Sequence, residues 1–165
     1  MIFEIEKGHN HSNRFVYKFF NYLNFNRFLD YSVVFNESCR YDLSNKEDIL
    51  DVNKLFGYSI GFNPHINSVR FGWNYNPKND KIDLFSYIYE GGARKFEFIK
   101  SVNFNHKYYL SIDKEKDYFS FHINDGIDIF GSKVKSNLDF EIGFSLWPYF
   151  GGTSLAPHKI SIELI

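Results

Sequence analysis

The sequence predicts an all-β fold: a single-domain antiparallel β-sandwich of about ten to twelve strands, with minimal helix, that spans residues 1–165. Three observations support this prediction. Short apolar segments alternate with turn signals at intervals of about 8–12 residues, which is typical of sandwiches and barrels. Aromatic residues make up 21% of the chain, with 20 Phe and 12 Tyr. Aromatic and β-branched residues suit the half-buried surface of a pleated sheet.

The N-terminal half contains predicted strands and one helix-like segment. Ser44–Val52 favours one or two helical turns, because Ser44 and Glu47 have the spacing of a capping box. Residues 21–27 are ambiguous, since Asn alternates there with Tyr, Leu and Phe. A break at 63–67 predicts a turn. The strands expected in this half are residues 2–7, 14–20, 28–35, 54–62 and 68–76.

The C-terminal half shows a stronger strand pattern. Residues 90–94, EGGAR, predict a hairpin turn, because glycine accepts the positive φ that tight turns require. Residues 113–117, DKEKD, predict a second, charged hairpin turn. A long loop, 147–158, separates the last two strands. The strands expected here are residues 82–89, 95–102, 107–112, 118–123, 127–130, 140–146 and 159–164.

Composition excludes several classes of partner. The net charge of −1 gives no electrostatic attraction to nucleic acid or to an anionic membrane. No apolar run reaches the roughly 18 residues of a membrane span, and the N-terminus lacks the pattern of a signal peptide. A lone cysteine, Cys39, cannot form an intramolecular disulfide. We therefore expect a soluble, cytoplasmic protein in which Cys39 is a small buried residue.

Two neighbouring strands carry faces of different chemistry, because successive side chains of a strand point to opposite sides. In 68–76, the apolar face is expected to face the core, and it includes Trp73. The opposite face carries Arg70 and Asn74. In 82–89, the aliphatic face opposes one that carries Phe85, Tyr87 and Tyr89. One sheet is therefore expected to present an aromatic and polar face as a shallow groove.

This second face and the loop 147–158 supply the candidate binding residues. Planar hydrogen-bonding groups beside aromatic rings are the groups that bind sugars. For Arg70, a buried ion pair that locks the sheet is the alternative interpretation. For Trp147, packing against the core is the alternative. The predicted ligand-binding residues are His65, Arg70, Tyr87, Tyr89, Trp147, Tyr149 and His158.

Neither a metal nor another cofactor is predicted. His9 and His11 form a pair without a nearby cysteine or acidic partner in their loop. Asp48, Asp51 and Asn53 offer oxygen atoms at close spacing, but they lack the glycine and the ligand number of a calcium loop.

Several motifs of the second half occur together in a known superfamily. Residues 109–112 (YLSI) and 118–126 (YFSFHINDG) give strand, charged turn, strand and Asn-Asp-Gly. Residues 149–152 (YFGG) and 156–162 (APHKISI) follow as a final loop and strand. This order resembles the jelly rolls of the concanavalin A-like lectin/glucanase superfamily over residues 54–165. The wider pattern DVNKLFG…RFGW…WPYFGG…APH is similar to small uncharacterised bacterial proteins.

The resemblance implies a jelly-roll sandwich with lectin-like carbohydrate binding, although the fold also hosts hydrolases, lyases and structural domains. Glucanases of this fold carry closely spaced acids, as Glu-x-Asp-x-x-Glu, on one strand. That pattern is absent here: Asp113, Glu115 and Asp117 flank lysines in a turn, and no third acid follows Asp139 and Glu141 on the same predicted strand. No catalytic residue is therefore predicted.

Three functional hypotheses follow. The first is a non-catalytic binding module for a saccharide or another polar ligand. The second is a polysaccharide-acting enzyme, a hydrolase or a lyase. The third is a structural or interaction protein of viral or mobile-element origin, which would pair with another copy or with a protein partner through a sheet edge.

Overall fold

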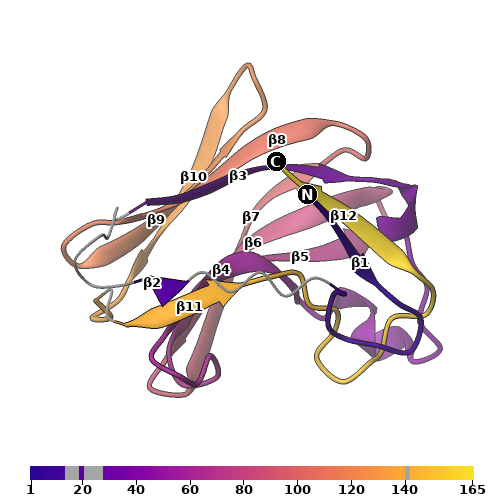
Figure 1. The fold of residues 1–165 in the computed structure, drawn as a ribbon. Helices are drawn as coiled ribbons and strands as arrows, with labels where there is room; N and C mark the ends of the chain where they lie inside the picture. Colours follow the sequence, from indigo (N-terminus) through magenta and orange to yellow (C-terminus); the bar gives the residue numbers. More distant parts are fainter. Residues whose placement is uncertain (14–18, 21–27, 140–141) are drawn as a thin grey trace.

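Two six-stranded antiparallel sheets face each other in the computed structural model, which describes residues 1–13, 19–20, 28–139 and 142–165 (Figure 1). Sheet A contains, in spatial order, β1 (Ile2–Ile5), β12 (Ile160–Leu164), β3 (Phe28–Phe35), β8 (Lys107–Lys114), β9 (Tyr118–Asn124) and β10 (Ile129–Lys135). Sheet B contains β2 (Phe19–Phe20), β11 (Gly143–Leu146), β4 (Asn53–Ile60), β5 (Ser68–Asn76), β6 (Lys81–Glu90) and β7 (Ala93–Val102). The predicted antiparallel sandwich is confirmed.

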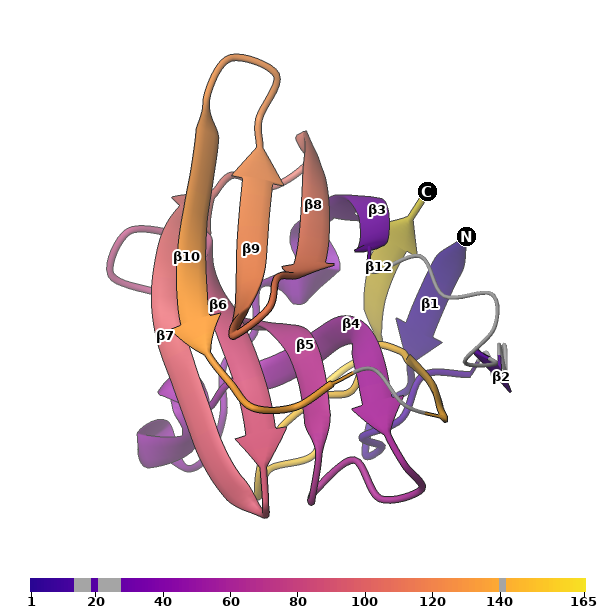
Figure 2. The ribbon, with the colours of Figure 1, turned by 90° about the vertical axis from the view of Figure 1, so that its left-hand side faces the viewer.

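The core lies between the two sheets and is rich in aromatic rings. Phe71 of sheet B meets Phe121 of sheet A edge to face, with ring centroids 5.2 Å apart. Trp73 is fully buried, as predicted for a core residue, and lies 5.5 Å from Phe35 of sheet A. On one side of the sandwich, the edge strands β10 and β7 run beside each other (Figure 2), where the hydroxyl of Ser132 donates to Glu97.

Several predicted elements differ from those observed. The predicted bounds of the strand 127–130 are wrong: β10 begins at Ile129, because the carboxylate of Asp125 accepts hydrogen bonds from the backbone of Ile127 and Asp128 and holds them in a turn. The predicted helical segment forms a 3₁₀ helix, η3 (Lys46–Leu50), but its N-cap is Asn45 and not Ser44. The expected strand 14–20, except Phe19–Phe20, and the ambiguous segment 21–27 lie outside the described residues.

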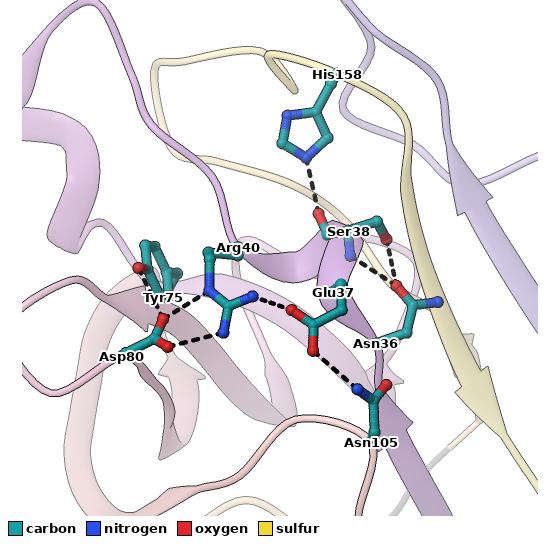
Figure 3. Close-up of polar contacts among 8 residues, drawn as sticks. All are labelled: Asn36, Glu37, Ser38, Arg40, Tyr75, Asp80, Asn105 and His158. Atoms are coloured by element: carbon teal, nitrogen blue, oxygen red, sulfur yellow. Dashed lines mark hydrogen bonds and ion pairs between the residues drawn. The ribbon is translucent and has the colours of Figure 1, made fainter.

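Helix is limited, in the residues that the structure describes, to η3 and a second 3₁₀ turn, η2 (Glu37–Cys39). A polar network fixes η2 (Figure 3): Arg40 forms ion pairs with Glu37 and with Asp80, and the hydroxyl of Tyr75 donates to Asp80. Cys39 is buried as expected, and its burial raises the pKa of the thiol. None of the described helical segments has the length and apolar character that crossing a lipid bilayer requires.

Candidate functional site

A cavity of about 370 Å³ lies on the outer face of sheet B, the face turned away from sheet A. Its floor comes from strands β4, β5, β6 and β7, and one wall comes from β11 and the loop that follows it. The cavity is lined by His11, Ser12, Lys54, Pro64, His65, Arg70, Tyr87, Tyr89, Arg94, Phe144, Ser145, Leu146, Trp147, Pro148, Tyr149, Gly151 and Gly152.

Strand register brings the floor residues together. Arg70 of β5 lies directly opposite Tyr87 of β6, and Tyr89 of β6 lies opposite Arg94 of β7. Directly opposed side chains of an antiparallel pair share one face of the sheet. Because Phe71 points into the core, its neighbour Arg70 must point to the outer face. The alternation of side chains along each strand and the register between strands therefore bring these side chains together on the outer face of sheet B.

A β-bulge in β4 adds a lysine to this face. The pairing of β4 with β5 shifts between Lys54 and Gly57, and both Leu55 and Phe56 are buried in the core. Lys54 then lines the cavity. Gly57 is required beside Arg70, because a Cβ at this position would lie 2.1 Å from the carbonyl oxygen of Val69.

The loop after β11 is fixed to the end of β4. Tyr149 and Lys54 exchange two backbone hydrogen bonds of 2.9 Å. The backbone N–H of Gly151 donates to the side-chain oxygen of Asn53. The carbonyl oxygen of Gly151 accepts a hydrogen bond from Lys54 Nζ at 3.0 Å. Gly151 has a φ of +84°, a backbone conformation that favours glycine. The wall of the cavity is thus held by defined contacts.

Arg70 is 6% exposed and has no carboxylate partner among the described residues. Its Nε and Nη2 donate to the hydroxyl of Ser68 at 3.3 Å, and Nη2 also donates to the carbonyl oxygen of Pro64 at 3.2 Å. Burial lowers the pKa of Arg70. The alternative interpretation, in which a buried carboxylate pairs with Arg70 and locks the sheet, is wrong for the residues that the structure describes.

Lys54 is a second buried cation, 7% exposed. Burial first, and then the positive charges of Arg70 and Arg94, lower the pKa of Lys54 to about 8, while the charge of Asp51 opposes this shift. Its Nζ lies 5.3 Å from the ring centre of Tyr87 and 5.5 Å from that of Tyr149. Tyrosine faces attract cations, so these rings partly stabilise the ammonium.

The tyrosines and His65 complete the polar surface. The hydroxyl of Tyr87 is buried and forms no hydrogen bond of ordinary geometry with the described residues, although Tyr89 and Arg94 lie close enough to influence it. Burial, and then the adjacent Tyr89, raise the pKa of Tyr87 to about 12, so its hydroxyl is protonated at neutral pH. His65 meets Tyr89 edge to face at 5.6 Å. Burial, Arg70 and Lys54 lower the pKa of His65, so the imidazole is neutral at pH 7 and above.

The structure brings six of the seven predicted binding residues to this one cavity: His65, Arg70, Tyr87, Tyr89, Trp147 and Tyr149. The ring of Trp147 packs against the core, as the alternative interpretation expects: it stacks on Phe3 with centroids 5.1 Å apart. His158 is not among the lining residues. Its Nε2 donates to the carbonyl oxygen of Ser38 at 2.8 Å (Figure 3), so it ties the far end of the loop to η2.

Lys54, Arg94 and His11 line the cavity but were not predicted from the sequence. The sequence did not predict Lys54 as a cavity residue, because simple alternation places it on the same face of β4 as Phe56. The bulge between them turns the two side chains to opposite faces. Arg94 was assigned to a turn, whereas β7 begins already at Ala93. The one available signal for Lys54 was a charged residue at the start of an otherwise apolar strand.

Comparisons with known proteins add little to this geometry. No protein-family model matches the chain, and no curated protein matches it in sequence. Among solved structures, it is similar to the carbohydrate-binding module CBM66 from Bacillus subtilis, with a TM-score of 0.39 and 14% identity over 93% of this chain and 74% of that one. It is also similar to the enzymatically active domain of tailspike protein 2 from bacteriophage CBA120, with a TM-score of 0.49 and 11% identity over 83% of this chain and 21% of that one. At these scores, neither likeness assigns a ligand or an activity to this chain.

Proposed function

We propose that the protein is a non-catalytic binding module for a saccharide, which enters the cavity on the outer face of sheet B. The observation that carries the proposal is the convergence of hydrogen-bonding groups and aromatic rings around one cavity. Arg70 and Tyr89 offer hydrogen-bonding groups, and Tyr149 offers ring surface. Saccharide sites combine these two features, because a sugar has polar edges and apolar faces.

The chemistry of the lining favours binding over hydrolysis. A glycoside hydrolase generally needs two carboxyl groups flanking the scissile bond. No aspartate or glutamate is among the described residues that line the cavity. The second hypothesis, a polysaccharide-acting enzyme, therefore lacks the acid and base of the common hydrolytic mechanism at this site.

The buried hydroxyl of Tyr87 gives a sharp test. An unpartnered buried hydroxyl costs folding free energy, so Tyr87→Phe should leave the protein equally stable or raise its stability by about 1 kcal/mol. If binding uncovers that hydroxyl and the saccharide bonds it, the same change should weaken binding roughly three- to tenfold. A glycan array would identify the ligand, and isothermal titration calorimetry would measure both proteins.

Tyr118→Phe is the matched control, because Tyr118 is 39% exposed on sheet A. It should leave the affinity unchanged. Equal affinities for wild type and Tyr87→Phe would remove Tyr87 from the site. Release of reducing ends or of unsaturated products from the bound glycan would show that the module is catalytic and overturn that part of the proposal.

A further inference from the structure

The cavity has an unbalanced charge. Three cationic side chains, those of Lys54, Arg70 and Arg94, line it, and no acidic side chain of the described residues does. The whole chain, in contrast, has a net charge of −1. The positive charge is therefore concentrated locally at the cavity.

Several cations elsewhere in the fold have carboxylate partners, which these three lack among the described residues. Arg40 pairs with Asp80, Lys95 with Glu90 and Lys133 with Glu115. Within the described residues, none of the three cavity cations forms an ion pair. Asp51 acts on Lys54, but its influence is the smallest of the four that shift the pKa of that lysine.

Two of these cations are also removed from water. Lys54 and Arg70 are 7% and 6% exposed. A buried charge without a counter-charge is unfavourable, because neither water nor an anion compensates for its lost solvation. An anionic group in the cavity would supply that missing counter-charge.

The donors that remain suit such a group. Nζ of Lys54 has three hydrogens and uses one for Gly151. Nη1 of Arg70 forms no hydrogen bond with the described residues, whose bonds to Arg70 involve only Nε and Nη2. Both cations lie within 6 Å of the ring centre of Tyr87. One small anion between the two cations, at the edge of that ring, would meet donors from both residues.

We propose that the saccharide bound here is acidic and that its carboxylate occupies the space between Lys54 and Arg70. This inference rests on the proposed function and narrows it from saccharides in general to those that carry uronate-type carboxyl groups. A carboxylate fits because its planar oxygens accept hydrogen bonds from a guanidinium and an ammonium at once. Sulfate esters share the charge, so the experiment must separate the two sources.

A matched set of ligands tests the inference. Oligogalacturonate, its fully methyl-esterified form and a sulfated neutral oligosaccharide would be titrated calorimetrically at pH 7 and low salt, beside a glycan array of neutral and acidic members. We expect the best array ligands to carry carboxylates. We also expect esterification of a bound uronate oligomer to lower its affinity at least tenfold.

Variants connect the preference to the cavity. Lys54→Met should remove most of the preference for the carboxylate over its ester. Arg94→Met should reduce it several-fold, and because Arg94 is exposed, this variant folds even if Lys54→Met does not. Lys107→Met removes an equal charge from an exposed position on sheet A and should change nothing.

Proton uptake provides an independent readout. The groups that act on Lys54 are Arg70, Arg94 and Asp51, and the rings of Tyr87 and Tyr149 face its Nζ. With a pKa of about 8, Lys54 is half protonated at pH 8, and a bound carboxylate should draw a proton onto it. Titrations at pH 8 in buffers of different ionisation enthalpy should show uptake of up to about half a proton, which Lys54→Met abolishes.

The outcomes separate the two proposals. If neutral or esterified glycans bind as tightly as uronates, the inference fails and the binding module stands. A preference confined to sulfated glycans also overturns the carboxylate. If no glycan of either class binds, the proposed function fails as well.

Discussion

Lys54 is a charged residue whose solvation in the folded protein differs strongly from that in an unfolded chain. In an unfolded chain a lysine has a pKa near 10.4. In the folded protein, burial and two neighbouring cations lower the pKa of Lys54 to about 8. Between these two values the unfolded chain binds more protons than the folded one. The free energy of unfolding must therefore rise with pH in that window.

Lys54→Met should remove this rise. From pH 7.5 to pH 10 we expect the wild type to gain on the order of 1–3 kcal/mol of stability relative to the variant. Denaturant unfolding of both proteins at several pH values measures the difference. Subtracting one curve from the other cancels the tyrosines that titrate at higher pH. Parallel curves would show that Lys54 is not buried as a cation.

At the scale of the element, β12 is a central strand of sheet A, between β1 and β3. Ile160, Ile162 and Leu164 are fully buried, whereas the side chain of Ile165 is 56% exposed. The sequence predicted this strand and its inward face, and both predictions are confirmed. The last strand is thus part of the core.

Removal of residues 159–165 should therefore cost several kcal/mol, at roughly 1.5–3 kcal/mol for each buried large aliphatic side chain. Such a loss is comparable with the whole stability of a domain, so the truncated chain should melt far below the wild type or fail to fold. Ile162→Ala should cost about 2–5 kcal/mol, and Ile165→Ala almost nothing. Thermal denaturation compares all three, and an unchanged melting temperature after truncation would contradict this account.

Other elements show where sequence patterns stop being sufficient. β3 and β5 have the predicted bounds, because alternation and flanking turn residues agree there. β10 does not, since Ile127, which is 92% exposed, was counted as a strand residue although Asp125 holds it in a turn. An apolar side chain alone does not reveal such a side-chain-to-backbone bond. The bulge beside Lys54 also has no signal in the pattern of apolar residues.

At the scale of the whole molecule, the outer face of sheet B extends beyond the cavity as an aromatic surface. Phe96 stacks on Tyr87 with ring centroids 6.2 Å apart, and Phe85 meets Phe98 at 5.9 Å. Phe96 and Phe98 are 45% and 55% exposed. A saccharide longer than the cavity would pass over these rings. Alternation predicted the face of Phe85 and Tyr87, but only the register of β6 with β7 brings Phe96 beside them.

Phe96→Ala should therefore weaken binding of long oligosaccharides several-fold and leave the shortest bound oligosaccharide unaffected. Calorimetric titration with a length series of the same oligosaccharide measures this dependence. Phe28→Ala is a control of similar exposure, 43%, on sheet A. An equal loss of affinity at every length would mean that Phe96 acts only by supporting Tyr87.

The candidate site, like the fold, could be predicted only in part from the sequence. Alternation alone placed Arg70 opposite the apolar face of its strand, and Tyr87 and Tyr89 opposite the aliphatic face of theirs, because the face of a strand residue depends on local sequence. Which strands stand side by side is a property of the whole chain, so the convergence of β4, β5, β6 and the loop after β11 needed the structure. His158 was misplaced for this reason, since its partner Ser38 lies 120 residues away in sequence.

The two tryptophans lie in different parts of the fold, and this difference offers an optical test of ligand binding. Trp73 is sealed in the core between the sheets, whereas Trp147 lines the cavity and stacks on Phe3. Emission from Trp73 should therefore follow unfolding, whereas a ligand in the cavity should change the emission of Trp147 through the loop that forms the cavity wall. In Trp73→Phe the remaining emission would report ligand entry without any attached label, so the glycans can be screened optically.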